Sequence, residues 1–241
     1  MKYFVPSWHL DIGDWASTQQ NITFDDAIGN MRIMNHADEN YGLIIGDYKP
    51  QLITQLNAEG VAPTDTLAAF DWIQDTALQD NNRIVDIQDF NWPKGTYFEY
   101  GPFSVDAICN DEHIARLLFN NIGQILRIER WQNGYHQEDI IMDTRGFVSS
   151  IQTFDKQNQL QKTIFFNLHG DWRVIEDAKT GRCHINSQYQ GDFTQSDYAS
   201  RHDLINEAIA SLIQKRLDKD SDQIVLTADD QQIIDLKQFN G

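Results

Sequence analysis

Apolar positions recur with two different periods along this chain, and the change of period divides it into three parts. In the first part, stretches with apolar side chains every three or four positions indicate amphipathic helices, and short continuous apolar runs between them indicate buried strands. The predicted strands are Tyr3–Val5, Leu43–Ile45 and Ile84–Ile87, and the predicted helices cover residues 24–34, 52–56 and 67–73. This β-α-β-α-α-β order predicts a parallel sheet with helices packed on it.

The middle part is marked by turn signals that recur every 11 to 13 residues. They are Asn120–Gly123, Asn133-Gly134, Thr144–Gly146, Gln157-Asn158, His169-Gly170 and Thr180-Gly181. Strand-like runs lie between them, for example at residues 124–131, 147–154 and 162–166, and regular turns at this spacing predict an antiparallel meander. Because apolar and polar residues alternate imperfectly in several of these strands, the pattern does not assign which face of the sheet is buried.

The last part returns to helical spacing. Apolar residues from Leu204 to Ile213 form one stripe, and Ile224–Leu226 then predicts a buried parallel strand. The predicted fold class is therefore α/β, a Rossmann-like parallel sheet with an inserted antiparallel β-meander. The predicted boundaries are 1–95 for the first part of the Rossmann-like domain, 96–190 for the inserted extended antiparallel sheet and 191–241 for the return to α/β.

Charge and composition exclude several classes of protein. The 241 residues include 19 basic and 36 acidic side chains, a formal net charge of −17, which repels nucleic acid and argues against a polybasic membrane anchor. The N-terminus lacks the pattern of a signal peptide, and no run approaches the ~20 apolar residues of a transmembrane segment. With only Cys109 and Cys183 available for disulfides, we expect a protein of the reducing cytoplasm.

Three short segments place proline or glycine beside aromatic or charged residues, at the ends of apolar runs where α/β proteins build sites. They are Tyr3-Phe4-Val5-Pro6-Ser7-Trp8, then Asn91-Trp92-Pro93-Lys94-Gly95 leading to Tyr100-Gly101-Pro102-Phe103, and Asp143-Thr144-Arg145-Gly146-Phe147-Val148-Ser149-Ser150. Together and in this order they resemble the first protein of the accessory Sec secretion system of Gram-positive bacteria. That family helps to export glycosylated serine-rich-repeat adhesins.

The resemblance implies a glycosyltransferase-like protein of the GT-B arrangement, with two Rossmann-type domains and an extended antiparallel sheet inserted in the first. Family members look like glycosyltransferases that lost their catalytic residues and act as scaffolds with two other accessory Sec proteins, so we expect no catalytic residue and no cofactor. The resemblance also implies the serine-rich-repeat adhesin and the accessory Sec translocase as partners, with the protein peripheral at the membrane. Two departures are that Thr144 replaces an acidic residue usual in the family, and that the second Rossmann-like domain, expected near Thr227, is missing, which we interpret as truncation.

Asp89, Asn91 and Trp92 follow the predicted strand Ile84–Ile87, at the carboxyl end where open α/β sheets bind ligands. Trp92, oriented by Pro93, is a candidate contact for a ligand or a peptide. The alternative is a hinge into the inserted sheet in which Trp92 fills a packing gap, since a tryptophan more often supplies buried area than a binding site.

Trp8 and His9 follow the first predicted strand in the same way. They are candidates for stacking in a carbohydrate groove, and the alternative is that they form a wall of the domain cleft. A glycine-rich phosphate loop, which a dinucleotide-binding protein would have at this point, is absent from the sequence.

Asp143 and Arg145 flank a predicted tight turn. They are candidates to pair with each other or with a partner protein. The alternative is an ordinary hairpin turn with Gly146 at positive φ.

The sequence predicts no metal site. Its seven histidines and two cysteines show no metal-ligand spacing, and Cys183 and His184 would point to opposite faces of a strand. The alternating Asp218, Asp220 and Asp222 begin like a calcium loop, but Gln223 stands where such a loop needs glycine.

These observations favour a cytoplasmic, non-enzymatic component of the accessory Sec system that binds its two companion proteins. An alternative is the acceptor-binding part of a glycosyltransferase, in which the inserted sheet holds the polypeptide while a partner supplies the donor site. Nucleotide-sugar turnover distinguishes these two hypotheses. A third hypothesis, a truncated product without function, predicts poor solubility through exposed apolar surface.

Overall fold

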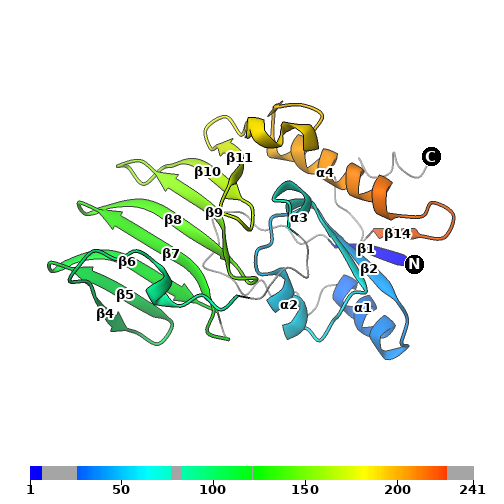
Figure 1. The fold of residues 1–241 in the computed structure, drawn as a ribbon. Coiled ribbons are helices and arrows are strands. Elements are labelled where there is room, and N and C mark those ends of the chain that lie inside the picture. Colours follow the sequence, from blue (N-terminus) through cyan, green and yellow to red (C-terminus); the bar gives the residue numbers. More distant parts are fainter. Residues whose placement is uncertain (7–25, 77–82, 121, 227–241) are drawn as a thin grey trace. The chain divides into compact units, whose positions relative to one another are not determined.

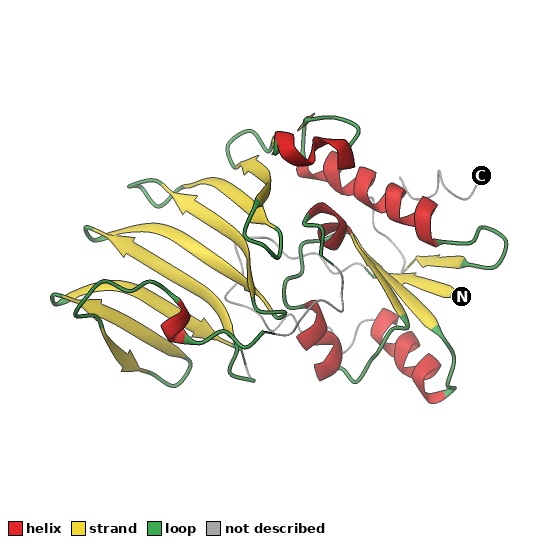
Figure 2. Ribbon diagram, in the orientation of Figure 1, coloured by secondary structure: helices red, strands yellow, loops and turns green. Residues whose placement is uncertain are grey.

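The computed structural model describes residues 1–6, 26–76, 83–120 and 122–226 (Figure 1, Figure 2). The chain divides into two compact units, one formed by Met1–Leu78 with His202–Gly241 and the other by Gln79–Arg201. The first unit is thus built from both ends of the chain, and the second unit is inserted between them in the sequence.

The first unit contains a four-stranded parallel sheet in the order β14-β1-β2-β3. Its elements are β1 (Lys2–Val5), α1 (Asp26–His36), β2 (Tyr41–Ile45), α2 (Leu52–Ala58), β3 (Asp65–Ala68), α3 (Ala69–Ile73), α4 (Arg201–Arg216) and β14 (Gln223–Leu226). The chain moves outward from β1 through β2 to β3 and returns on the other side of β1 as β14. This is the order of a doubly wound sheet, in which ligands bind beyond the carboxyl ends of the strands where the order reverses.

Segments far apart in the sequence meet at β1. All four residues of β1 pair with β14, from Lys2 opposite Gln223 to Val5 opposite Leu226. The amino group of Met1 also donates a hydrogen bond to the Asp222 carboxylate at 2.6 Å. That bond is the main reason why the pKa of Asp222 lies below its usual value.

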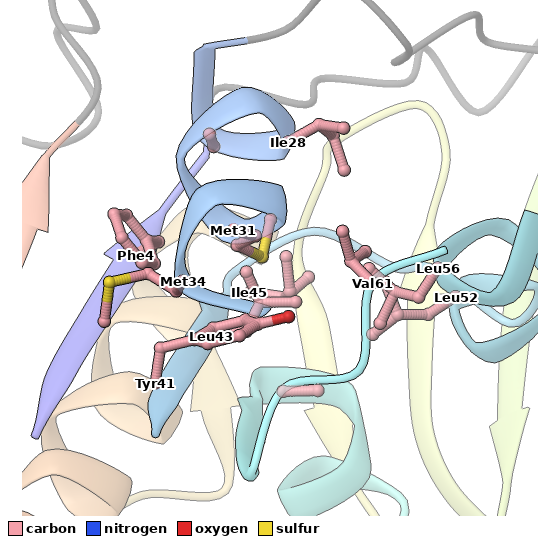
Figure 3. Packing of buried hydrophobic residues seen from close by; sticks show 12 residues of the cluster. Phe4, Ile28, Met31, Met34, Tyr41, Leu43, Ile45, Leu52, Leu56 and Val61 are labelled. Atoms are coloured by element: carbon pink, nitrogen blue, oxygen red, sulfur yellow. The ribbon is translucent and has the colours of Figure 1, made fainter. Parts of the chain in front are cut away.

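The core of the first unit lies between the sheet and its helices (Figure 3). Its buried side chains are Phe4, Ala27, Ile28, Met31, Met34, Tyr41, Leu43, Ile45, Leu52, Leu56, Val61 and Ala68. The predicted helical spacing before residue 35 is confirmed, because the buried residues of α1 lie on one face. Strand β2 is buried at all five positions, as expected for a strand inside a parallel sheet covered by helices. Burial of one large aliphatic or aromatic side chain contributes about 1.5–3 kcal/mol.

The prediction of a single helix over residues 67–73 is wrong. Leu67 lies in β3, and α3 begins only at Ala69. Leu67, Phe70 and Ile73 are all buried. Their spacing therefore reflects burial in a strand and in the helix that follows it, and not one face of a single helix.

The predicted strand Ile84–Ile87 is also wrong. Residues 83–86 have no regular structure, and Ile87–Asp89 forms the short 3-10 helix η2. The Asp86 carboxylate accepts a hydrogen bond from the Gln88 amide at 2.9 Å, and the Asp89 carboxylate accepts one from the Asp86 amide at 3.1 Å. This reciprocal capping fixes a turn at this point.

The second unit is a ten-stranded antiparallel sheet in which every strand neighbours the next one in sequence. Its strands are β4 (Tyr97–Tyr100), β5 (Ser104–Cys109), β6 (Glu112–Phe119), β7 (Ile125–Gln132), β8 (Tyr135–Asp143), β9 (Phe147–Phe154), β10 (Leu160–Phe166), β11 (Trp172–Asp177), β12 (Cys183–Ile185) and β13 (Asp197–Tyr198), and a second 3-10 helix, η3 (Ser187–Asp192), precedes β13. The six predicted turn signals connect successive strands from β6 to β12. The prediction of an inserted antiparallel meander is therefore confirmed.

Cross-strand register separates the two faces of this sheet. One row of facing residues is apolar and consists of Val105, Leu117, Ile128, Ile140, Ile151, Ile164 and Ile175. The adjacent row, one residue along each strand, consists of Asp106, Arg116, Glu129, Asp139, Gln152, Thr163 and Glu176. Because successive residues of a strand point to opposite faces, the first row defines an apolar face and the second a polar face.

The apolar face is covered by the segment that precedes β4. Val85, Ile87, Phe90 and Trp92 pack against a buried cluster on β5–β8. The inserted sheet thus has a hydrophobic core built from residues of its own unit. Among the described residues, no helix has the length and apolar composition to cross a lipid bilayer.

Candidate functional site

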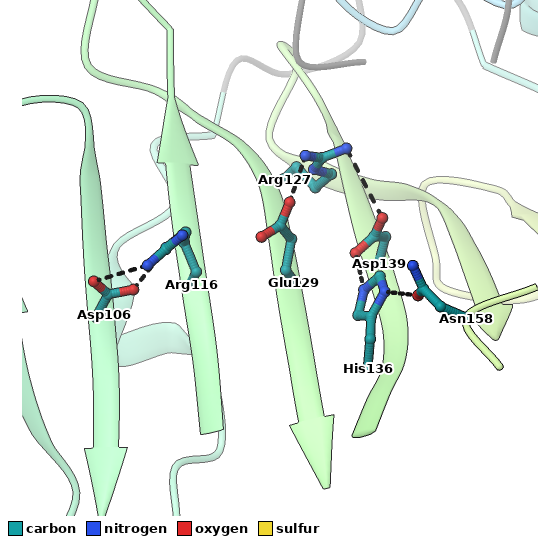
Figure 4. A network of polar contacts seen from close by, with 7 residues as sticks. All are labelled: Asp106, Arg116, Arg127, Glu129, His136, Asp139 and Asn158. Atoms are coloured by element: carbon teal, nitrogen blue, oxygen red, sulfur yellow. Dashed lines mark hydrogen bonds and ion pairs between the residues drawn. The ribbon is translucent and has the colours of Figure 1, made fainter. Parts of the chain in front are cut away.

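Charged side chains follow one another across the polar face of the second unit (Figure 4). Asp106 on β5 faces Arg116 on β6, which faces Glu129 on β7, which faces Asp139 on β8. Side chains directly opposite each other on neighbouring antiparallel strands have Cβ atoms about 4.5–5.5 Å apart. The register alone therefore brings four charges from four strands into one row.

Asp106 is held as a carboxylate by two neighbours on β6. Arg116 Nε donates to Asp106 Oδ1 at 2.8 Å, and His113 Nε2 lies 2.8 Å from the same oxygen. The hydrogen bond from Arg116 is the main cause that lowers the pKa of Asp106, and the contact with His113 adds to it. The negative charge at this point of the face is therefore fixed at neutral pH.

Arg127 and His136 organise the centre of the row. Arg127 Nη2 donates to Glu129 Oε1 at 2.5 Å, and Arg127 Nη1 lies 3.9 Å from Asp139 Oδ2. His136 Nε2 lies 2.7 Å from Asp139 Oδ1, and its Nδ1 lies 2.8 Å from Asn158 Oδ1. Because its two ring nitrogens face oxygen atoms of different residues, His136 bridges Asp139 and Asn158.

Asp139 is the buried member of the row, with 4% of its surface exposed. Burial raises its pKa, while the charges of Arg127 and His136 act in the opposite direction. Asp139 therefore serves as the internal anchor of the network, and Arg116 and His113 form its exposed part.

Four rings line up beside the charged row on the same face. The centroid distances are 4.6 Å between His113 and Trp131, 5.5 Å between Trp131 and His136, and 4.3 Å between His136 and Phe154. Each ring inclines toward its neighbour at 48°, 34° and 25°, so the ring faces are used within the row. The four rings therefore form one continuous row beside the charges.

The polar face offers fixed charges beside a row of rings, which is chemistry for recognition. In the part of the chain that the structure describes, no three His, Cys, Asp or Glu side chains group so that they could hold a metal ion. Each acidic residue of the row in β5–β8 has a basic group as a neighbour. The arrangement fits the binding of another polar surface.

Asp143 ends β8, Arg145 lies in the turn between β8 and β9, and the two side chains pair with each other. Arg145 Nε donates to Asp143 Oδ1 and Arg145 Nη2 to Asp143 Oδ2, both at 2.8 Å. The two residues expose only 4% and 6% of their surface. Gly146 follows with φ +85°, and the amide of Arg83 donates to the carbonyl of Arg145 at 3.1 Å, so this turn fastens residue 83 to the sheet. A role in contacting a partner stays a prediction.

Asp89, Asn91 and Trp92 do not follow a strand, because the strand predicted before them is absent. Asp89 completes the cap of η2, and Asn91 is exposed. Trp92 Nε1 donates to the carbonyl of Ile87 at 2.7 Å, and its ring meets Phe98 edge-on at 5.5 Å. Trp92 thus belongs to the core of the apolar face, and a ligand contact by these residues stays a prediction.

Trp8 and His9 lie outside the described residues. They follow β1, the strand at which the order of the parallel sheet reverses. Their proposed carbohydrate contact stays a prediction.

The sequence analysis missed the charged row on β5–β8. Its members are far apart in sequence, and only the pairing of four strands brings them together. A local signal of the row was present, since each of the four strands has a charged residue directly beside its central apolar one. Which of these charged residues face each other depends on the strand register, and bulges near Ile108 and Trp131 shift that register by one residue.

Comparison with known proteins places the chain in a family. The family model of the first accessory Sec system protein (accessory secretory protein 1) matches residues 1–239. The chain belongs to this family. Its relatives include the accessory Sec system proteins of Staphylococcus aureus, 27% identical over 95% of this chain, and of Streptococcus gordonii, 29% identical over 93%. The chain spans about half the length of these relatives, 45% and 44%.

Solved structures of relatives show the same fold. A complex of accessory secretory proteins 1, 2 and 3 from Streptococcus pneumoniae matches all of this chain with a TM-score of 0.87 and 27% identity, and covers 50% of that chain. The glycosylation-associated Gap123 complex of Streptococcus agalactiae matches 95% of this chain with a TM-score of 0.86 and 25% identity, over 47% of that chain.

Glycosyltransferases share the fold at lower identity. The GtfA/B complex bound to UDP and GlcNAc matches 95% of this chain, and 44% of its own, with a TM-score of 0.61 and 12% identity. The predicted fold class, a Rossmann-like sheet with an inserted meander like the first half of a GT-B glycosyltransferase, is confirmed.

Proposed function

We propose that this chain is a non-catalytic, glycosyltransferase-like component of the accessory Sec export system. In this proposal it assembles with two other accessory Sec proteins at the cytoplasmic face of the membrane and helps to export a serine-rich glycoprotein adhesin. The observation that carries the proposal is the family match over residues 1–239. Two related structures that are described as complexes of three accessory proteins support it.

The polar face of the inserted sheet is our candidate for one partner contact. It combines charges fixed by internal pairs with a row of rings, and Arg116 and His113 are exposed on it. A rigid surface of this kind loses little conformational entropy on binding, so its charges can select a partner of complementary charge.

The test is co-expression of this chain with the other two accessory Sec proteins of the same organism, followed by purification through a tag on one of them. We expect all three to co-purify. A soluble and folded chain that fails to join the other two proteins would overturn the proposal.

A charge exchange tests the polar face within the same experiment. The double variant Asp106→Arg/Arg116→Asp keeps an internal pair but reverses the order of charges, and we expect it to fold and to co-purify less than the unchanged chain. Lys162→Ala is the matched control, because Lys162 is an exposed cation on the opposite face of the same sheet. Equal recovery of all three chains would remove the polar face from the contact.

A glycosyltransferase role is the second candidate, because the fold matches GtfA. It predicts release of UDP from UDP-GlcNAc by the three-protein complex when a serine-rich acceptor peptide is added. The scaffold proposal predicts no release above that of a sample without protein. Turnover that depends on this chain would favour the second candidate.

A further inference from the structure

The two edges of the ten-stranded sheet are unlike (Figure 1). At one edge β13 has two residues and carries Asp197, and short charged edges are a common protection against unwanted strand pairing. At the other edge β4 has four residues and the sequence Tyr-Phe-Glu-Tyr. This edge lacks the lysine, proline or bulge within the strand that would block pairing.

Backbone groups of β4 point away from the sheet at two positions. The Gly101 amide donates to the Ser104 carbonyl at 2.8 Å, which marks these two residues as a hydrogen-bonded pair. Because such pairs alternate along an antiparallel ladder, the N–H and C=O groups of Phe98 and Tyr100 are directed outward. An added strand would find these groups in register for pairing.

Aromatic side chains surround this edge and are unusually exposed. Tyr97, Tyr100 and Phe103 expose 47%, 74% and 82% of their surface. All three belong to β4 or to the turn that follows it. Tyr100 lies on the same face as Phe98 and Tyr97 on the opposite face with Glu99, so exposed rings lie on both sides of this edge. Exposed apolar groups gathered in one place commonly mark an interaction surface.

The negative charge of Glu99 on β4 favours an added strand that carries a basic residue. Glu99 faces Asp106, so the polar row begins with two acidic residues, and Asp106 is already satisfied by Arg116 and His113. A cation directly opposite Glu99 on an added strand would continue the row with a favourable pair. On the other face, Phe98 and Tyr100 would meet apolar side chains of the same strand.

A second copy of this chain fits less well. Two β4 strands can pair antiparallel in two registers that align at least three residues and keep the side chains of each pair on the same face. One register places Glu99 opposite Glu99 of the copy, and the other places it opposite Tyr97. Neither brings a cation to Glu99.

We propose that the β4 edge binds an extended segment of another protein, which adds a strand to the sheet and carries a basic residue between apolar ones. Strand addition of this kind takes affinity from backbone hydrogen bonds and specificity from alternate side chains. The proposal does not depend on the secretion role, because it concerns only the edge of this sheet.

The test uses the whole chain and a blocked heptapeptide, acetyl-Val-Thr-Val-Lys-Val-Thr-Val-amide. Its central lysine is placed to face Glu99, and its valines to continue the face of Phe98 and Tyr100. We expect saturable binding in a fluorescence titration and slower hydrogen exchange of the Phe98 and Tyr100 amides. A peptide with glutamate in place of lysine should bind about fivefold more weakly. A peptide N-methylated at the residues that pair with β4 should not bind.

Variants of the chain separate strand addition from contact with the ring of Tyr100. Tyr100→Pro removes an outward amide and leaves the bonds to β5 intact, so we expect at least about tenfold weaker binding. Tyr100→Ala is its control, since it removes the ring but keeps the amide. Glu99→Lys should reverse the preference between the lysine and glutamate peptides.

Three results would overturn the proposal. They are no saturable binding of the lysine peptide, equal binding of the N-methylated peptide, or equal binding by the folded Tyr100→Pro variant. A dimer of the free chain in analytical ultracentrifugation that Tyr100→Pro abolishes would instead assign the edge to a second copy. None of these measurements uses the other accessory proteins, so failure here leaves the proposed function untouched.

Discussion

Replacing Gly146 with alanine tests whether the β8–β9 turn fastens the segment before β4 to the sheet. Gly146 has φ +85°, a left-handed conformation that costs a residue with a Cβ atom about 1–2 kcal/mol. A Cβ atom would also lie 2.0 Å from the carbonyl oxygen of Arg83 and 2.8 Å from its carbonyl carbon. Both are backbone atoms that no rotamer change can move. Overpacking of this kind costs a further ~1–3 kcal/mol, so we expect a total loss of about 2–5 kcal/mol.

Gly134 provides the matched control. It lies in the turn before β8 with φ +76°, and nothing lies within 4 Å of a Cβ atom added there. Gly134→Ala should therefore cost only the conformational part, about 1–2 kcal/mol. The difference between the two variants measures the contact with Arg83.

The assay is urea unfolding, with the slope m compared across variants. With a slope of about 2 kcal/mol/M, Gly146→Ala should move the midpoint lower than Gly134→Ala by roughly 0.5–1.5 M. Hydrogen exchange of the Arg83 amide, bonded to the Arg145 carbonyl at 3.1 Å, should accelerate in Gly146→Ala only. Equal midpoints and equal exchange in both variants would refute the reasoning.

Three further predictions concern buried groups. Trp92→Phe should lower the free energy of unfolding by about 0.5–1.5 kcal/mol through loss of the 2.7 Å bond to Ile87, and Trp92→Ala by about 3–5 kcal/mol; similar losses in denaturant melts would contradict a core role for the ring. Burial raises the pKa of Asp139 above its unfolded value of 3.8, so between the two pKa values the folded chain holds more protons than the unfolded chain. The free energy of unfolding should therefore decrease as the pH rises through this range. Asp139→Asn should remove that slope in melts across the same range. Burial lowers the pKa of Lys49 from 10.5 to about 8, so between these pH values the unfolded chain holds more protons than the folded chain. The free energy of unfolding should rise with pH in this range, by up to about 3 kcal/mol relative to Lys49→Met. Parallel plots of unfolding free energy against pH for the two proteins would disprove it.

The sequence patterns predicted those elements whose signal is local. The helical spacing of Met31 and Met34 and the continuous run of β2 each report one environment along the whole element. The strand prediction at Ile84–Ile87 was wrong because Val85 and Ile87 pack on the sheet from irregular backbone, and such a run looks like a short strand in the sequence. The helix prediction at Leu67 was wrong for a related reason. The strand β3 and the helix α3 after it both bury apolar residues, and the spacing of these residues looks like that of one helix.

The candidate site was beyond sequence reasoning because it is a property of pairing. Glu129 and Asp139 face each other only in the register set by the turn at Asn133-Gly134 and by the bulge beside Trp131. A shift of one residue would turn both carboxylates to the apolar face. The turn residues predicted the meander. Which side chains face each other across its strands depends on β-bulges, and no local sequence pattern marked these bulges.

The pairing of β1 with β14 sets the order in which the two units can be completed during synthesis. In the meander each strand pairs with the one made just before it, so its contacts are local and can form as the chain leaves the ribosome. Lys2 must wait for Gln223 to emerge before that side of β1 gains its neighbour. A ribosome halted before Gln223 would therefore carry a meander whose strands are already paired, joined to an N-terminal sheet still open along β1, where an unpaired strand edge favours aggregation.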